Sequence, residues 1–247
     1  MKGKCNVGKR GLILGVVLLL VALVSSFAIG RAEEKIDTSL AGWWNFNEEN
    51  GGTVKDSSGY GNDGSIAGEA IWVKEGAITA LQLNGVDNYI EIGPEKFDDL
   101  ANGTIEIWFK CSSAEEPGRV LFSHHSPPNY CNIFLVPHRH LIFDMVINGQ
   151  VQLYSDKPVS LDSWCHVATT FGAKGMKMYV NGVLQKKSNP TTKSFKEMGS
   201  SKTNTIGTIG KSTAYNFHGI IGEARVYNRA LTGEEIKNNY DYGKINH

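Results

Sequence analysis

One short segment of the sequence concentrates oxygen-bearing side chains among glycines. It runs Asp56-Ser-Ser-Gly-Tyr-Gly-Asn-Asp63. Calcium takes about six to eight oxygen atoms from carboxylates, carbonyl groups and water, on loops that can curl around the ion. Asp56 and either the side chain or the carbonyl of Asn62 would supply such oxygens. The alternative is a turn without an ion, in which the Asp56 carboxylate caps backbone N–H groups.

Aromatic and imidazole side chains in predicted loops and strand edges form a second group with binding chemistry. Sugars stack on aromatic rings while their hydroxyl groups make directed hydrogen bonds, so a site for them combines rings with a few polar groups. The candidate ligand-binding residues are Tyr130, Tyr154, Tyr215, His124 and His125. In the alternative interpretation each is an ordinary surface or core aromatic residue.

These side chains need a scaffold, and the chain around them is patterned as short β-strands. Residues 104–110 alternate as a half-buried strand does, with Ile105, Ile107 and Phe109 on one side. Runs of alternating or β-rich residues recur between turn residues along the chain. The predicted strands are residues 42–47, 80–84, 89–93, 104–110, 120–124, 132–136, 141–147, 150–155, 165–171, 176–180, 183–187, 204–209 and 219–227.

The turns between these strands favour hairpins. Asn148-Gly149 and Asn181-Gly182 each separate two predicted strands, and Asn-Gly is the preferred pair for a type I′ turn because both residues must tolerate positive φ. Residues 232–235 form a capping box that predicts one short C-terminal helix, with Ile236 and Tyr240 on its apolar side. The pattern predicts an all-β, antiparallel sandwich or barrel.

The N-terminus is patterned for export. A basic start is followed by an apolar run without charge from Leu12 to Gly30, as in a signal peptide or a signal anchor. We expect residues 1–32 to be this segment, residues 33–39 a linker and residues 40–243 the folded domain. The protein is then secreted, periplasmic or at the cell surface, and it meets a membrane only if the first segment stays uncleaved.

Composition limits the class of partner. The chain has 247 residues, with 25 basic and 25 acidic side chains and a formal net charge of zero. No basic stripe interrupts this balance, so we expect no nucleic-acid partner. The folded part has the length of one large all-β domain.

Several segments together resemble laminin-G-like jelly-roll domains of the concanavalin A-like lectin and glucanase superfamily, an architecture that pentraxins share. The resemblance implies two stacked antiparallel sheets with a short C-terminal helix. It also implies a domain that binds carbohydrates, glycoconjugates or proteins. The segments that carry it are Gly42-Trp-Trp-Asn-Phe-Asn-Glu48, residues 54–64, residues 80–92, Thr104-Ile-Glu-Ile-Trp-Phe-Lys110, residues 164–171 with 177–184, and residues 219–231.

The resemblance adds two expectations about sites. Many members hold one structural calcium ion where the first and last strands meet, which implies Glu223 as a third ligand beside Asp56 and Asn62, although the family more often has aspartate there. Pentraxins bridge two neighbouring strands, which implies a Cys111–Cys165 disulfide and leaves Cys131 over. The alternative is that all three cysteines are small buried hydrophobic residues.

The resemblance also bears on catalysis. Glucanases of this fold use a Glu-x-Asp-x-x-Glu strand, because retaining hydrolysis needs carboxyl groups about 5 to 5.5 Å apart. This chain has no such run and no Gly-x-Ser-x-Gly motif, and Glu106 stands alone in its strand. The sequence therefore predicts a non-catalytic carbohydrate- or glycoconjugate-binding module. The alternatives are a structural or adhesive protein-interaction domain at the cell surface and, with less support, a glycan-active enzyme.

Overall fold

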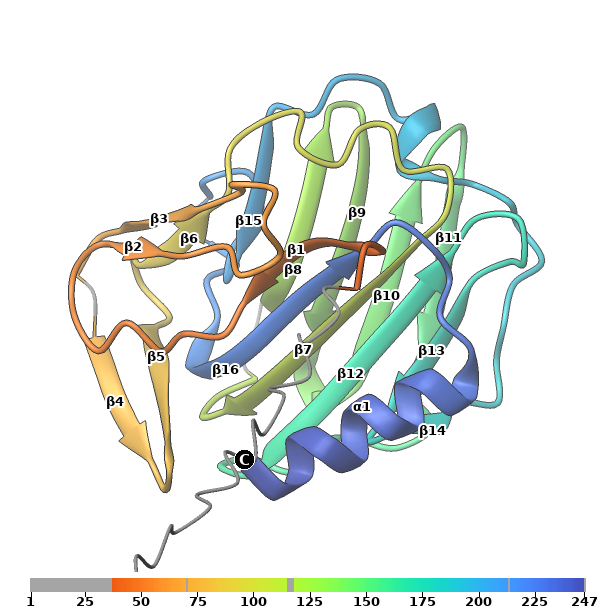
Figure 1. Cartoon of the computed structure of the whole chain (residues 1–247). Helices are drawn as coiled ribbons and strands as arrows, with labels where there is room; N and C mark the ends of the chain where they lie inside the picture. Colours follow the sequence, from red (N-terminus) through yellow and green to blue (C-terminus); the bar gives the residue numbers. More distant parts are fainter. Residues whose placement is uncertain (1–36, 70, 115–117, 213, 247) are drawn as a thin grey trace, which may run out of the picture. The chain divides into compact units, whose positions relative to one another are not determined.

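A computed structural model describes residues 37–69, 71–114, 118–212 and 214–246. The described chain consists mainly of antiparallel β-strands in two stacked sheets (Figure 1). This confirms the predicted all-β sandwich. The predicted export segment, residues 1–32, lies outside the described residues. Within them, no helix has the length and apolar character that a membrane-spanning helix needs.

The first sheet contains the strand expected at the centre of the domain. Its strands are β1 (Leu40–Trp44), β4 (Ile71–Glu75), β5 (Ile78–Asn84), β7 (Gly103–Cys111), β12 (Trp164–Phe171), β13 (Lys177–Val180), β14 (Val183–Leu184) and β16 (His218–Tyr227). They follow the order β14-β13-β12-β7-β16-β5-β4, and β1 also pairs with β16. The closing strand β16 therefore lies beside the central strand β7 and is paired with the opening strand.

The second sheet lies behind the first in Figure 1. Its strands are β2 (Thr53–Val54), β3 (Gly64–Ala67), β6 (Tyr89–Glu91), β8 (Arg119–Ser126), β9 (Asn129–Leu135), β10 (Leu141–Val146), β11 (Gln150–Tyr154) and β15 (Thr203–Ile206). They follow the order β11-β10-β9-β8-β15-β6-β3-β2. Short 3₁₀ turns occur at Pro137–Arg139 and Phe195–Glu197.

Strands β2, β3 and β4 were not predicted from the sequence. Strand β2 has only two residues, and β4 lies at the edge of its sheet with intermediate exposure at most of its positions. A strand that is half-covered along its whole length has no strict alternation of apolar and polar residues, so the pattern that identifies half-buried strands is missing.

The core fills the space between the two sheets. Ile105, Ile107 and Phe109 of β7 are all buried in it, as the alternation predicts. The strands of the second sheet contribute every other residue, for example Ile133 of β9 and Phe143 of β10. Because successive side chains of a strand point to opposite faces, the residues between them point away from the core.

The two predicted Asn-Gly turns are present. Asn148 and Gly149 have φ values of 47° and 113° between β10 and β11, and Asn181 and Gly182 have values of 50° and 73° between β13 and β14. These positive φ values confirm the prediction, because asparagine and glycine are favoured where a turn needs positive φ. The turns set the register of both hairpins.

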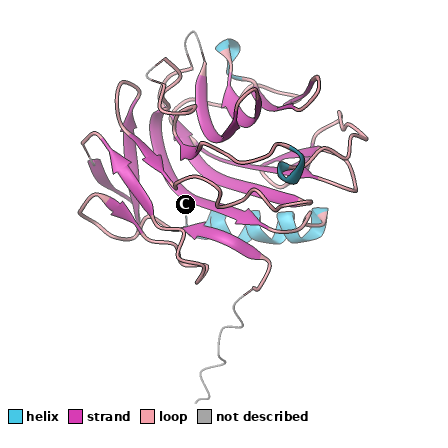
Figure 2. Ribbon diagram, turned by 90° about the horizontal axis from the view of Figure 1, so that it is seen from above, coloured by secondary structure: helices cyan, strands magenta, loops and turns pink. Residues whose placement is uncertain are grey.

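The predicted C-terminal helix is α1 (Gly233–Asn246), on the outer side of the first sheet (Figure 2). The Glu235 carboxylate accepts the Thr232 N–H at 2.7 Å, and Thr232 Oγ1 accepts the Glu235 N–H at 3.2 Å, which confirms the capping box. Tyr240 of α1 stacks on Trp108 of β7 with ring centroids 5.6 Å apart. The helix thereby covers the face of β7 opposite to the core.

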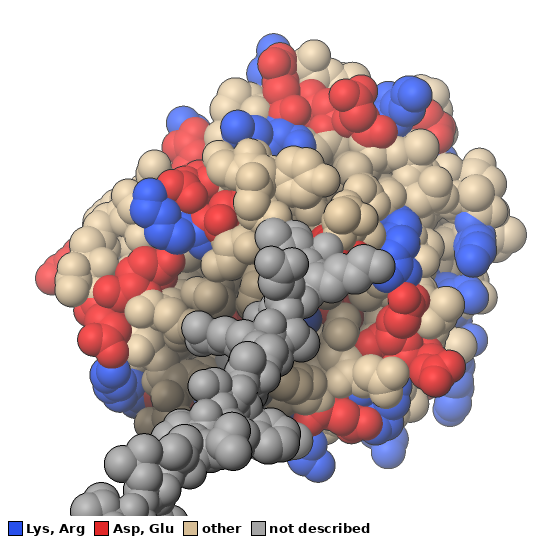
Figure 3. Space-filling model, in the orientation of Figure 1, with Lys and Arg blue, Asp and Glu red and all other residues tan. Residues whose placement is uncertain are grey.

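Charges of both signs alternate on the face that carries α1. Figure 3 shows lysine, arginine, aspartate and glutamate side chains interspersed across it. Among the described residues, some opposite charges form ion pairs, such as Lys55 with Asp63 at 2.6 Å and Arg229 with Glu235 at 2.8 Å. The described residues of this face therefore make no extended field of one sign.

The expected Cys111–Cys165 disulfide is absent, and this prediction is wrong for the structure. Cys111, Cys131 and Cys165 are all free and buried. Strands β7 and β12 do pair antiparallel, but Cys165 lies opposite Phe109 and not opposite Cys111. The two cysteines are thus diagonal neighbours on one face, and such positions lie about 7 to 8 Å apart, beyond the usual Cα separation in a disulfide.

We expect the three buried thiols to react slowly with an alkylating reagent in the native protein at pH 8. Burial raises the pKa of Cys111 to about 11 and that of Cys165 to about 12, so neither group is a thiolate. Peptide mass spectrometry after denaturation, with alkylation but without reduction, should find both cysteines alkylated. A linked peptide pair that separates only after reduction would contradict the free thiols.

Candidate functional site

A row of polar side chains crosses the second sheet on the face that points away from the core. Cross-strand pairing connects Gln152 to Asp144, Asp144 to Asn132, Asn132 to Ser123 and Ser123 to Thr205. Each of these residues alternates with a core residue on its own strand. With their outward neighbours they form a surface that we call the Asp144 patch, made of Ser123, His125, Tyr130, Asn132, Asp144, Gln150, Gln152 and Tyr154.

Asp144 of β10 lies at the centre of this patch and is only 3% exposed. Gln150 donates from Nε2 to both carboxylate oxygens at 3.0 Å. Burial raises the pKa of Asp144, while hydrogen bonds from Gln150, Gln152 and Tyr130 oppose the rise. The carboxylate therefore holds three neighbouring side chains in place.

Tyrosines border the patch. Tyr154 of β11 is 40% exposed and donates its hydroxyl to Gln152 Oε1 at 2.9 Å. Tyr130 of β9 is half-buried, and its pKa is raised by burial and then by the nearby Asp144 carboxylate and Tyr215. Tyr215, on the loop between β15 and β16, is 37% exposed. Tyr130 and Tyr154 thus lie on the two sides of the strand that carries Asp144, and Tyr215 lies near Tyr130.

Several buried polar atoms of the patch have no hydrogen-bond partner among the described residues. They are Ser123 Oγ, Asn132 Oδ1 and His125 Nδ1. Ser123 is fully buried, Asn132 is 3% exposed, and burial lowers the pKa of His125. Buried polar atoms are normally paired, so atoms like these call for water or a ligand that can reach them.

His124 does not belong to this surface, and the prediction that it contacts a ligand is wrong. It is fully buried and stacks on Phe195 with ring centroids 4.1 Å apart. Its Nδ1 lies 2.7 Å from Asn204 Oδ1, and burial lowers its pKa. Neighbouring residues of a strand point to opposite faces, so only His125 faces outward.

The sequence of residues 84–237 matches the laminin G-type family model for the concanavalin A-like lectin and glucanase superfamily. This segment is more than half of the chain. The chain belongs to this superfamily. The matched segment begins in β5 and ends in α1, so it includes every residue of the Asp144 patch. None of the curated proteins compared with the chain matches it.

Solved structures of the same fold accompany this superfamily match. One is domain 4 of an extracellular arabinanase from Geobacillus stearothermophilus, with arabinotriose, at 20% identity and a TM-score of 0.66, covering 81% of this chain and 97% of that one. Another is the binding domain of Paraclostridial Mosquitocidal Protein 1, at 16% identity and a TM-score of 0.68, covering 85% and 53%. A third is the Trypanosoma rangeli sialidase, at 15% identity and a TM-score of 0.67, covering 84% and 33%. At such identities the likeness concerns the fold alone.

The three predicted calcium ligands do not form an open cation site. The Asp56 carboxylate accepts the N–H groups of Trp43, Ser58 and Asn62, each at 2.9 Å, as a capping side chain does. Glu223 Oε1 accepts Trp43 Nε1 and Arg225 Nη2, both at 2.6 Å. A guanidinium on the third carboxylate opposes a second cation, so these residues do not fit calcium in this arrangement. In the described parts of the chain, histidine, cysteine and acidic residues form no cluster of three that would hold a metal ion.

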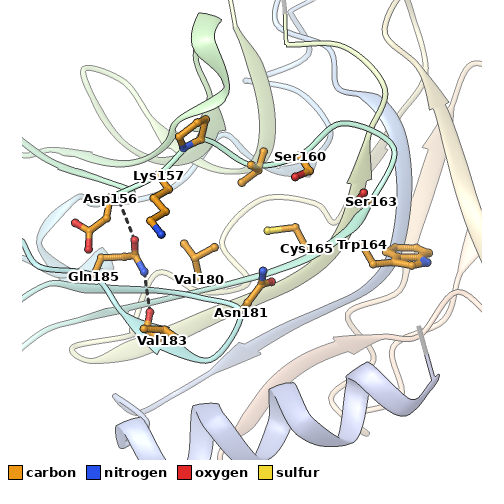
Figure 4. A pocket seen from close by; sticks show the side chains of 12 residues that line it. Asp156, Lys157, Ser160, Ser163, Trp164, Cys165, Val180, Asn181, Val183 and Gln185 are labelled. Atoms are coloured by element: carbon orange, nitrogen blue, oxygen red, sulfur yellow. Dashed lines mark hydrogen bonds between the residues drawn. The ribbon is translucent and has the colours of Figure 1, made fainter.

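A cavity of about 430 Å³ opens between the loop after β11 and the β13–β14 hairpin (Figure 4). Val159, Cys165 and Val180 are among its apolar lining residues, and Asp156 and Lys157 bring both charges to it. None of its lining residues carries a buried polar atom without a partner, in contrast to the Asp144 patch. The cavity has the volume of a small-molecule site, but its polar lining groups leave no buried atom that needs a ligand.

Glu106 and Glu223 lie close together under α1, and the two carboxyl groups superficially resemble a catalytic pair. Glu106 is buried, and burial raises its pKa to about 7. Arg225 pairs with Glu223 beside it, and Asn239 of α1 donates to Glu106 Oε2 at 2.9 Å. The space between these side chains is too small for a water molecule. A substrate therefore cannot reach Glu106 while α1 is in place.

The sequence suggested Tyr130, Tyr154, Tyr215 and His125 but missed the polar residues between them. Asp144, Asn132, Gln150 and Gln152 were not singled out, because each is one polar residue in a predicted strand. One signal was available for Asp144, the aspartate inside the otherwise apolar segment Leu-Ile-Phe-Asp-Met-Val of β10. An acidic residue in such a strand needs partners on the outer face.

Proposed function

We propose that this protein is a non-catalytic carbohydrate-binding module that holds a glycan on the Asp144 patch. The observation that carries the proposal is the combination of exposed tyrosine rings with buried polar atoms that have no partner in the described residues. Glycans offer apolar C–H faces and hydroxyl groups that both donate and accept hydrogen bonds. The C–H faces can pack on the tyrosine rings, and the hydroxyl groups can pair with the buried polar atoms of the patch.

The mode of binding follows from the depth of each residue. Tyr130, Tyr154 and Gln150 reach the surface and would contact the sugar rings and hydroxyl groups directly. Asp144 lies beneath them and acts as a positioning residue, because it fixes the Gln150 amide through two hydrogen bonds. A preorganised amide loses little conformational entropy when a ligand binds.

Structures of the same fold support this function. The arabinanase domain was solved with arabinotriose, and a carbohydrate-binding domain of a Ruminococcus gnavus sialidase was solved with α2,3-sialyllactose. A related botulinum neurotoxin domain interacts with ganglioside molecules. The sialidase enzymes among them are about three times the length that this chain covers, so their catalytic activity is not carried over.

Export is part of the proposal and rests on the N-terminal sequence. The basic start and the apolar run from Leu12 to Gly30 have the order of a signal peptide or an anchor. A secreted, periplasmic or surface location would expose the module to extracellular glycans. The mass of the mature protein tests this part, because retention of residues 1–32 would exclude cleavage.

Replacing Tyr130 or Tyr154 by alanine is expected to weaken glycan binding by about tenfold or more, since buried aromatic contacts contribute about 1.4 kcal/mol or more each. Binding of arabinotriose and of a wider oligosaccharide array would be measured by titration calorimetry and array fluorescence. Tyr60→Ala is the matched control, because Tyr60 is 60% exposed on the loop between β2 and β3. Equal losses in all three variants, or no saturable binding to any glycan, would refute the proposal.

A protein-interaction role is the second candidate, and one observation favours it. Val183 and Leu184 of the β13–β14 hairpin are 60% and 49% exposed beside the cavity of Figure 4. Neighbouring exposed aliphatic side chains are a feature of protein-binding surfaces. If the glycan array is empty, Leu184→Ala should instead weaken adhesion to cells or matrix proteins.

A further inference from the structure

We propose that the Asp144 patch selects an extended, neutral oligosaccharide and discriminates against anionic sugars. This inference rests on the proposed function and names the ligand class of the same site. Two independent features carry it, the span between the aromatic rings and the charge of the outward positions.

The span follows from the strand register. Tyr130 of β9 lies opposite Val146, and Tyr154 of β11 lies opposite Ile142, on the two sides of β10. The two tyrosines are therefore two strands apart across the sheet and four residues apart along it. With about 4.8 Å between strands and about 3.3 Å per residue, their Cα atoms are separated by about 16 Å.

Asp144 lies midway on this diagonal, because it occupies the position between Ile142 and Val146 that faces the same side. A ligand that contacts both rings has to pass over it. Both side chains reach inward along this diagonal, Tyr130 to Asp144 and Tyr154 to Gln152, so the rings lie closer together than their Cα atoms. A single sugar ring is still shorter than the Cα diagonal. The geometry therefore favours several linked sugars that run from one tyrosine to the other.

The charge of the patch follows from the outward positions of the same strands. From β6 to β11 in the second sheet, these positions include the carboxylates of Glu91 and Asp144 and no lysine or arginine. Lys211 reaches the face from a loop but pairs with Glu91 at 2.8 Å. Lys193, in the segment between β14 and β15, reaches the β10–β11 turn and donates to the Gly149 carbonyl at 2.7 Å.

A sugar carboxylate over Asp144 would meet a like charge, and the outward positions of these strands hold no lysine or arginine to balance it. Like charges that face each other across an interface disfavour binding. Asn132 Oδ1 has no partner among the described residues, so it needs a donor. Hydroxyl groups supply donors, and a carboxylate supplies only acceptors. Neutral sugars satisfy the patch where anionic sugars do not.

The test uses the full chain and matched oligosaccharides. Titration calorimetry would compare a monosaccharide, a disaccharide and a trisaccharide of one neutral series that the array identifies. A second comparison would use that trisaccharide with and without a terminal sialic or uronic acid. We expect about tenfold or greater tightening from monosaccharide to trisaccharide, and about tenfold or greater weakening when the acidic sugar is added.

Two variants separate the two features. Tyr154→Ala should abolish most of the gain with chain length, because one end of the diagonal loses its ring. Asp144→Asn keeps the shape and removes the charge, so it should reduce the penalty for the acidic sugar to about threefold or less. Exposed Glu234→Gln on α1 is the control for a change of net charge.

The outcomes are distinguishable from failure of the proposed function. An array without any glycan ligand would overturn the proposed function, and this inference with it. Saturable binding that is equally tight for the monosaccharide, or tighter for the acidic trisaccharide, would leave the glycan-binding function standing and overturn the inference alone. Retention of the full penalty in Asp144→Asn would overturn the charge argument.

Discussion

Replacing Glu106 by glutamine is expected to stabilise the protein at pH 8 by about 3 kcal/mol and to change its stability little below pH 4.5. Burial under α1 is the largest influence on this carboxyl and raises its pKa from 4.5 to about 7. Each pKa unit corresponds to about 1.36 kcal/mol, so a difference of 2.5 between 7 and 4.5 gives about 3 kcal/mol.

The direction follows from proton binding in the two states. Between pH 4.5 and about 7 the folded protein keeps the Glu106 proton that the unfolded chain releases. Stability therefore falls as pH rises through this interval. Glutamine resembles the protonated carboxyl and cannot ionise, so the variant lacks this fall.

Neighbouring side chains also shift the pKa of Glu106, some of them against the effect of burial. Arg225 lowers the pKa of Glu106, Glu223 raises it, and hydrogen bonds from Asn239 and Tyr227 lower it. His166 of β12 lies 3.8 Å from Oε1 through its Nε2. If Arg225 outweighed burial, the carboxylate would be the stable form and the glutamine variant would lose stability at pH 8.

Urea unfolding of wild type and Glu106→Gln from pH 4 to pH 8.5 measures the difference. Glu234→Gln, at an exposed position of α1, is the matched control and should follow wild type at every pH. Parallel curves for wild type and Glu106→Gln would show that the carboxyl titrates normally. The expectation would then be wrong.

Replacing Trp44 by alanine is expected to cost about 3 to 5 kcal/mol of stability, which is a large part of the roughly 5 to 15 kcal/mol typical of a folded domain. The Trp44 ring is fully buried and packs edge-on against Phe97 with centroids 6.3 Å apart. Its Nε1 donates to the Asn62 carbonyl at 2.9 Å, so the ring also ties β1 to the loop after β2.

The midpoint of urea unfolding measures this loss. Trp72→Ala is the comparison, because the Trp72 ring is partly exposed and should cost clearly less. Trp44→Phe should recover part of the loss, since it restores buried aromatic volume without the hydrogen bond. A change of less than about 1 kcal/mol in Trp44→Ala would contradict the packing described for this residue.

Local features of the sequence explain why some site residues could be located and why one was misplaced. Tyr130, Tyr154 and His125 were found because a ring in a predicted loop or strand edge is visible in the sequence. His124 and His125 were both named from the sequence, and which of the two faces outward depends on a bulge in β8 between Val120 and Phe122. A bulge shifts the alternation by one residue, and nothing in the segment marks it.

Whether the oxygen-rich loop fits calcium depends on a non-local arrangement. The oxygen-rich loop is real, but its Asp56 carboxylate is occupied by three backbone N–H groups. Glu223 pairs with Arg225, two residues away on the same strand. The sequence shows both residues but not that their side chains meet. Only the folded chain decides whether oxygen atoms converge on an ion or on the protein itself.

The sequence alone determined the strand character, the two Asn-Gly turns, the capping box of α1 and the inward side of β7. These features depend on interactions between residues close in the chain, so alternation and turn chemistry report them directly. The tertiary structure alone decided the register of β7 against β12, the burial of Glu106 under α1 and the assembly of the Asp144 patch. The patch unites side chains from four strands, and pairing between strands depends on long-range packing that no short segment encodes.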